Sequence, residues 1–201
     1  MREQIYQYGL PLMRRFFEAN GISIPAFYRY SDTHLMTERM REELELKSQV
    51  SDGASYGLYF DSNVFVNVTK SRLPVQNPGG MAWSYPCWKT DRTAIGILAH
   101  ECGHHADEET GLPGRSKQWK EVCEKGRKLT SYEPKIYEAW AETMRLFILN
   151  PDLLRLGIPH RYKFITEVVK LIPSETRPWQ EVLYNHTAYV YAGEKWIKKG
   201  D

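Results

Sequence analysis

The sequence predicts an α+β fold, with a small sheet in the N-terminal part and a mainly helical C-terminal half. Runs rich in β-branched and aromatic residues cluster before residue 70, and such runs favour strands. After residue 90, apolar residues recur at helical spacing. The 201 residues contain no repeat, low-complexity tract or linker, and this length suits one domain. We therefore expect a single domain over residues 1–201, with the sheet in about residues 20–110 and helices in about residues 111–201.

The first part of the chain predicts four elements, which are a helix over 1–20, a strand over 24–30, a helix over 31–47 and a hairpin over 56–70. Pro11 is expected to disturb the first helix. Ser31 or Asp32 is a suitable cap for the second helix. The hairpin has aromatic and β-branched runs on both sides of an Asp-Ser-Asn turn at 61–63.

A long loop is predicted over residues 71–90, where PVQNPGG and WSYPCW hold too many breakers for regular structure. Helices are then expected over residues 91–108, 116–129, 134–149, 159–172 and 178–197. Asp91 is expected to cap the first of these helices. Within it, the small Gly103 would let a neighbouring helix approach closely.

Composition and charge narrow the classes of function. Lysine plus arginine exceed aspartate plus glutamate by two, and the basic residues are scattered, so no nucleic-acid partner is indicated. No apolar run reaches membrane-spanning length, and the charged N-terminus does not resemble a signal peptide. An odd count of three cysteines without CxxC spacing favours a reducing compartment. We therefore expect a cytoplasmic protein without a membrane partner, whereas its oligomeric state does not follow from the sequence.

The segment HECGH at residues 100–104 matches the HExxH signature of zinc peptidases. His100 and His104 are four residues apart, so both rings project from one helical face at a spacing that suits one zinc ion. Glu101 lies close to them without having to bind the metal, which is the position of a general base. The alternative is that the histidines face solvent at a helix end, but the apolar residues before His100 favour a helix that is largely buried around the site.

A catalytic zinc ion needs a third protein ligand. Asp107 lies on the same helical face and is one candidate. The stronger candidates are Glu138 and Glu142, which share one face of the predicted helix 134–149. One of these carboxylates could bind the metal while the other orients a histidine ring. The alternative is a solvated stripe on an amphipathic helix.

The two segments resemble the gluzincin metallopeptidases, in which HExxH is followed by ExxxE on a later helix. The segment EAWAETMRLF, residues 138–147, is similar in particular to the ExxAExFRLx segment of the anthrax lethal factor and Pro-Pro endopeptidase group. The resemblance covers about residues 55–150 and implies a zincin-like fold with an active-site helix. It also implies that Glu138 is the zinc ligand and that Glu142 supports His100.

The resemblance further implies an oxyanion-stabilising tyrosine. The group carries this tyrosine seven residues before the ligand glutamate, where the present chain has Ser131. Tyr132 stands beside it and is assigned the role. Tyr137 adjoins Glu138 and is expected to point elsewhere.

The expected function is that of a zinc-dependent endopeptidase with one Zn²⁺ per chain, Glu101 as general base and a peptide or protein as substrate. One strand of the hairpin over 56–70 would form the rim of the cleft and pair with an extended peptide. His160 and His186 are expected to be ordinary surface or core residues. Two other functions stay open, a regulatory protease of the ImmA/IrrE kind with one protein target and a non-catalytic zinc-containing binding module. The intact Glu101 favours an enzyme, because binding alone needs no base.

Overall fold

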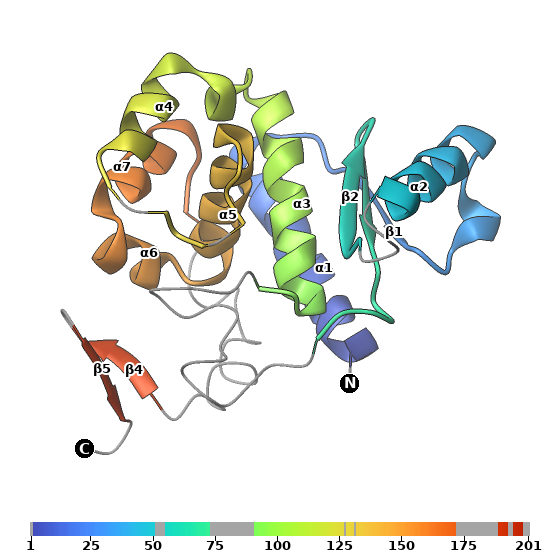
Figure 1. The fold of residues 1–201 in the computed structure, drawn as a ribbon, viewed down its shortest axis with the longest axis horizontal. Coiled ribbons are helices and arrows are strands. Elements are labelled where there is room, and N and C mark those ends of the chain that lie inside the picture. Colours follow the sequence, from blue (N-terminus) through green and yellow to red (C-terminus); the bar gives the residue numbers. More distant parts are fainter. Residues whose placement is uncertain are drawn as a thin grey trace.

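The computed structural model describes residues 2–50, 55–72, 91–126, 128–130, 132–171, 189–192 and 195–198. Helix α3 (Ala94–Glu109) lies between a small sheet on one side and a group of helices on the other (Figure 1). The N-terminal sheet and the mainly helical part that follows confirm the predicted α+β class. No helix in the described part of the chain combines the length and apolar content that crossing a bilayer would need.

Helix α1 (Arg2–Asn20) packs against α3 and supplies much of the main core. Its buried face includes Leu12, Phe16 and Phe17. The helix continues through Pro11, so the expected disturbance does not divide it. Pro11 is exposed, and so is Gln7 four residues earlier, whose carbonyl loses its helical partner and can bind water instead.

The sheet has the order β1-β3-β2, formed by β1 (Ala26–Arg29), β2 (Gly57–Phe60) and β3 (Asn63–Val66). Strand β1 is parallel to β3, and β2 is antiparallel to β3. The predicted strand and hairpin are therefore confirmed. Asp61 and Ser62 form the turn with φ values of 51° and 58°, as a tight hairpin turn requires. The side-chain amide of Asn63 donates a hydrogen bond to the Asp61 carbonyl over 2.6 Å and supports this conformation.

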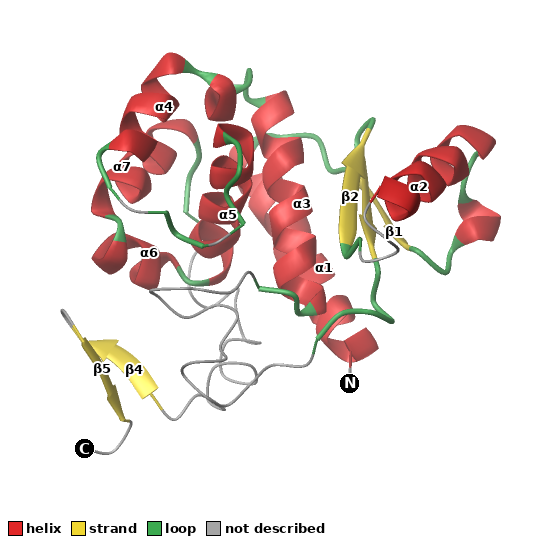
Figure 2. Ribbon diagram, in the orientation of Figure 1, coloured by secondary structure: helices red, strands yellow, loops and turns green. Residues whose placement is uncertain are grey.

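Alternate residues of β3 face two different cores. Val64 and Val66 join the main core with α1 and α3, whereas Phe65 faces helix α2 (Glu38–Val50). Figure 2 shows the strands between α2 on one side and α3 on the other. This alternation follows from the two-residue period of a strand.

The predicted helix over 31–47 begins later than expected. A short 3₁₀ turn, η1 (Thr33–Leu35), precedes α2. The hydroxyl of Thr37 accepts a hydrogen bond from the Met40 amide over 3.3 Å, so Thr37 caps α2 instead of Ser31 or Asp32. The Asp32 carboxylate instead accepts hydrogen bonds from the backbone and side chain of Arg29.

The later helices are α4 (Lys117–Glu124), α5 (Ile136–Leu149), α6 (Pro151–Gly157) and α7 (Pro159–Val168). Helix α6 is not among the predicted helices, because the sequence pattern suggests that Pro151 ends a helix. In the structure Pro151 occupies the first helical position, which proline tolerates. The predicted helix over 178–197 is wrong over its last part. Strands β4 (Tyr189–Ala192) and β5 (Lys195–Lys198) form an antiparallel pair there, in line with their aromatic and β-branched residues. Residues 178–188 and most of the predicted loop over 71–90 lie outside the described residues.

Helices α3 and α5 pack closely at Gly103, as the sequence predicts. A Cβ atom at Gly103 would lie 3.0 Å from both Ala141 Cα and Met144 Cβ. The indole of Trp140 donates to the Gly103 carbonyl over 3.0 Å. This contact fixes the distance between the helix that carries HECGH and the helix that carries Glu138.

We predict that Gly103→Val lowers the free energy of unfolding by about 1–3 kcal/mol, because an overpacked core must move backbone to make room. Urea unfolding of the variant and the parent protein measures this loss. Gly103→Ala adds a smaller side chain and serves as the graded control. An unchanged midpoint for Gly103→Val would show that the two helices can separate without cost.

Candidate metal centre

Three side chains on α3 and α5 bring their donor atoms within 4.8 Å of one another, namely His100, His104 and Glu138. The Nε2 atoms of His100 and His104 lie 3.1 and 3.5 Å from Glu138 Oε2. His100 is buried, and the other two are partly buried. Within the described ranges, no other group of histidine, cysteine or acidic residues has this arrangement.

Helix α3, which carries both histidines, is largely apolar and has a capped N-terminus. The hydroxyl of Thr93 accepts a hydrogen bond from the Gly96 amide over 3.1 Å, so Thr93 is the cap and not Asp91. The Asp91 carboxylate instead accepts hydrogen bonds from the amide and hydroxyl of Thr93. Asp91, which lies two residues before Thr93, therefore supports the capping residue from outside the helix.

Glu142 is fully buried beneath His100. Its Oε1 atom lies 2.8 Å from His100 Nδ1. An ionised carboxylate can only accept a hydrogen bond, so Nδ1 carries the proton and Nε2 is the atom left for a metal. The two glutamates of α5 therefore do not form a solvent-exposed stripe. Glu138 contacts both His100 and His104, and Glu142 is fully buried.

Opposite charges shift the pKa values at this site. Burial by itself lowers the pKa of His100, but hydrogen bonds to Glu138 and Glu142 outweigh it and raise the pKa to about 10. Burial raises the pKa of Glu142, but the nearby Arg145 and His100 lower it to about 2. The pKa of Glu138 also falls well below its usual range, because its hydrogen bonds with His100 and His104 outweigh burial. Without a metal, the favoured state is therefore a positively charged His100 between the ionised carboxylates of Glu138 and Glu142.

We predict that zinc binding at neutral pH releases about one proton, because His100 must free its Nε2 atom. The pKa of about 10 lies above the range from about pH 7 to pH 9. Zinc affinity should therefore rise by about tenfold per pH unit across that range, as protons compete less. Calorimetry in buffers of different ionisation enthalpy counts the protons, and competition with a chelator measures the affinity. A pH-independent affinity would contradict the protonated state of His100.

Glu101 lies on the side of α3 that faces the sheet. A Cβ atom at Gly57 would stand 2.8 Å from Glu101 Cγ and 2.7 Å from Ile97 Cγ2, so only glycine lets β2 approach here. Burial raises the pKa of Glu101, although His100 and His104 counteract it. A base must be able to take up a proton at working pH, and a raised pKa favours that.

A pocket of about 380 Å³ opens over the three side chains and Glu101. Its other lining residues are Lys47, Gly57, Leu58, Tyr59, Glu108, Arg115, Tyr132 and Tyr137. Strand β2 forms one wall, and it lies at an edge of the three-stranded sheet. The expected contribution of the hairpin to the rim is therefore present in the structure.

Two tyrosines stand over the site. The Tyr132 ring centroid lies 5.6 Å from that of His100, and the Tyr137 ring lies 6.0 Å from that of His104. The expectation that Tyr137 points elsewhere is wrong, because the first turn of α5 runs along the pocket. Burial, followed by the charges of Glu138 and Glu101, raises the pKa of the Tyr132 hydroxyl, so it keeps its proton and can donate a hydrogen bond.

Asp107 is not part of the metal-binding group. Its Oδ1 atom accepts a hydrogen bond from the Gly114 amide over 2.6 Å, and its Oδ2 atom lies 3.7 Å from Arg115 Nε. These contacts hold the carboxylate at the C-terminal end of α3. His160 is partly buried against Gly126 and lies outside the group, as expected, and His186 lies outside the described residues.

No role for His105 follows from the sequence pattern, and the structure places this residue behind the site. It is fully buried, and its Nε2 atom lies 2.8 Å from the Ser23 carbonyl, so Nε2–H is the donor. Its Nδ1 atom lies 3.3 Å from the Tyr59 hydroxyl. His105 thereby joins α3 to strand β2, which forms the opposite wall of the pocket.

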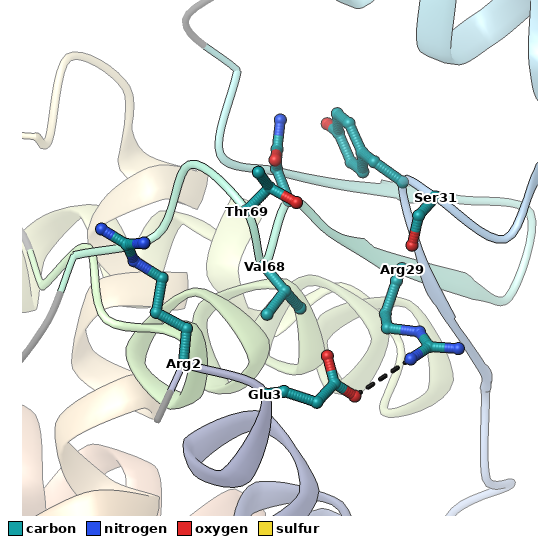
Figure 3. Close-up of a pocket in the computed structure, with 8 residues that line it drawn as sticks. Arg2, Glu3, Arg29, Ser31, Val68 and Thr69 are labelled. Atoms are coloured by element: carbon teal, nitrogen blue, oxygen red, sulfur yellow. Dashed lines mark hydrogen bonds and ion pairs between the residues drawn. The ribbon is translucent and has the colours of Figure 1, made fainter.

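A second pocket of about 420 Å³ lies at the start of α1 and contains no histidine (Figure 3). Arg29, which is partly exposed, lines this pocket and pairs with Glu3 over 3.0 Å and with Asp32 over 2.8 Å. The group that could hold a metal ion lies in the other pocket, above α3.

Comparison of the chain with protein-family models, with curated proteins and with solved structures finds no match. The structure itself shows an α+β chain with a His-His-Glu group that could hold a metal ion.

Proposed function

We propose that the chain is a zinc-dependent endopeptidase. One observation carries the proposal, the convergence of His100, His104 and Glu138 beside Glu101 in one pocket. Two imidazoles and a carboxylate suit zinc, and three protein ligands are typical of catalytic rather than structural zinc sites. The hydrogen bond between His100 and Glu142 provides the usual support for such a ligand.

Zinc bound there would supply Lewis-acid polarisation and lower the pKa of water toward neutrality. Glu101 takes the proton of the attacking water and delivers it to the leaving amine. The Tyr132 hydroxyl donates a hydrogen bond to the oxygen on which negative charge develops. The outer edge of β2, which is an edge strand of the three-stranded sheet, pairs with the main chain of an extended peptide and places it over Glu101.

The function is tested by metal analysis and by a screen of the zinc-loaded protein against a diverse peptide library. We expect one zinc per chain and cleavage that stops when a chelator removes the metal and returns when zinc is restored. A protein that binds zinc and captures peptides without cutting them would be a binding module. Cleavage confined to one protein target would favour the regulatory protease.

We predict that Tyr132→Phe lowers kcat by about 10²–10³-fold with little change in KM, which is typical when one oxyanion donor is removed. Tyr137→Phe is the matched control, because Tyr137 lines the same pocket beside His104. Arg115 and Lys135 also lie over the Tyr137 ring, which indicates a packing role. If Tyr137→Phe causes the large loss and Tyr132→Phe does not, the donor is Tyr137.

A further inference from the structure

A buried arginine lies directly behind the carboxylate that supports His100. Arg145 is on α5, three residues after Glu142, and both side chains are fully buried. Its Nε atom lies 3.2 Å from Glu142 Oε1, and its Nη2 atom lies 3.2 Å from Glu142 Oε2. The guanidinium thus holds both carboxylate oxygens at once, a geometry that fixes the plane of the carboxylate.

The same guanidinium also contacts the segment just before the N-terminus of α3. Its Nη1 atom lies 3.6 Å from Asp91 Oδ2, and the other Asp91 oxygen supports the capping residue Thr93. A continuous series of contacts therefore runs from His100 through Glu142 and Arg145 to Asp91, and it joins α5 to the N-terminus of the helix that carries the histidines.

The energetic cost of this arrangement argues for a role at the site. Burying an ion pair seldom stabilises a fold more than apolar side chains of similar volume would. The shared Oε1 atom bonds to both His100 Nδ1 and Arg145 Nε. Any rotation of Glu142 away from Arg145 would therefore also move the acceptor away from the histidine.

We propose that Arg145 is a positioning residue of the metal centre, which fixes Glu142 so that His100 presents Nε2 to the metal. The proposal rests on the proposed zinc site and adds a residue that touches neither metal nor substrate. It acts through Glu142, so the effect of changing Arg145 depends on the presence of the glutamate.

The test is a double-mutant cycle that measures zinc affinity by chelator competition in the full chain. R145Q and E142Q should each weaken zinc binding by about 10–100-fold, as is typical for residues that support a metal ligand. The double variant E142Q/R145Q should bind no more weakly than E142Q alone. The visible spectrum of the Co²⁺-substituted protein should shift in R145Q and in E142Q in the same direction.

R145K keeps the positive charge but loses the bidentate contact with the two oxygens of the Glu142 carboxylate. It covers the case in which R145Q does not fold. R145K should weaken zinc binding when Glu142 is present and have no further effect in the E142Q background. R161Q is the matched control, because Arg161 is another buried arginine that pairs with a carboxylate, Glu133, and neither residue belongs to the metal-binding group or lines its pocket. It should lower thermal stability and leave zinc affinity unchanged.

Wild-type zinc affinity in folded R145Q or R145K, or additive losses in the double variant, would overturn the positioning role alone. A parent protein that binds no zinc would overturn the proposed function together with it. These two failures are separated by the measurement on the unsubstituted chain.

Discussion

Glu101→Gln is expected to leave zinc binding and folding intact while reducing peptide cleavage by at least about 10²–10⁴-fold, the range typical of general acid–base catalysis. The substitution preserves the shape of a side chain that lies against Gly57 and Ile97 with little room to spare. It removes only the ability to accept the proton of the water and pass it on. Because both half-steps need that ability, the loss should appear in kcat rather than in KM.

The measurement compares kcat and zinc content of the variant with those of the parent protein on a peptide from the library screen. Glu109→Gln is the matched control, since Glu109 is exposed at the end of the same helix and outside the pocket. It should retain nearly full cleavage. Equal rates for Glu101→Gln and the parent protein would refute Glu101 as the base.

The second large effect concerns the metal itself. His104→Ala and Glu138→Ala should each weaken zinc binding by more than the roughly 100-fold that marks the upper range for supporting residues. Each removes one of the three donors that converge within 4.8 Å, and a site with two remaining protein donors holds zinc poorly. Metal analysis after dialysis against a weak chelator measures the loss.

Two controls separate this effect from a general loss of fold. His34→Ala removes an exposed histidine away from the site, and Glu121→Gln neutralises an exposed glutamate on α4. Both should keep one zinc per chain. Full zinc in Glu138→Ala would mean that the third ligand is a different residue. Asp107 and Glu142 are poor substitutes, because each is already held by other partners.

Local patterns in the sequence predicted most of the framework. The hairpin was predictable because its turn and its β-branched runs lie within 15 residues, 56–70, so the signal is complete at short range. The helix boundaries were less certain. Asp91 and Thr93 are both good capping residues, and Thr93 is the cap in the structure. The Asp91 carboxylate lies 3.6 Å from Arg145, a contact that the local sequence does not reveal.

The C-terminal part shows where the local pattern was ambiguous. The segment that contains Tyr189–Ala192 and Lys195–Lys198 has aromatic and apolar residues that fit both a helical face and a pair of short strands. The structure has the strands. Periodicity alone does not decide between the two for short segments, because strand pairing supplies hydrogen bonds that a single segment does not show.

By itself, the sequence determined that His100 and His104 share one helical face with Glu101 beside them, because an i,i+4 spacing is a property of the helix alone. Only the tertiary structure decided which carboxylate completes the group. Asp107 is on the same helix but turns to Gly114, whereas Glu138 comes from a helix that Gly103 allows to pack against α3. Likewise, no local pattern reveals that Arg145 reaches Asp91. The contacts of Glu138 with the histidines and of Arg145 with Asp91 join residues far apart in the chain, so they exist only once the core that brings α3 and α5 together has formed.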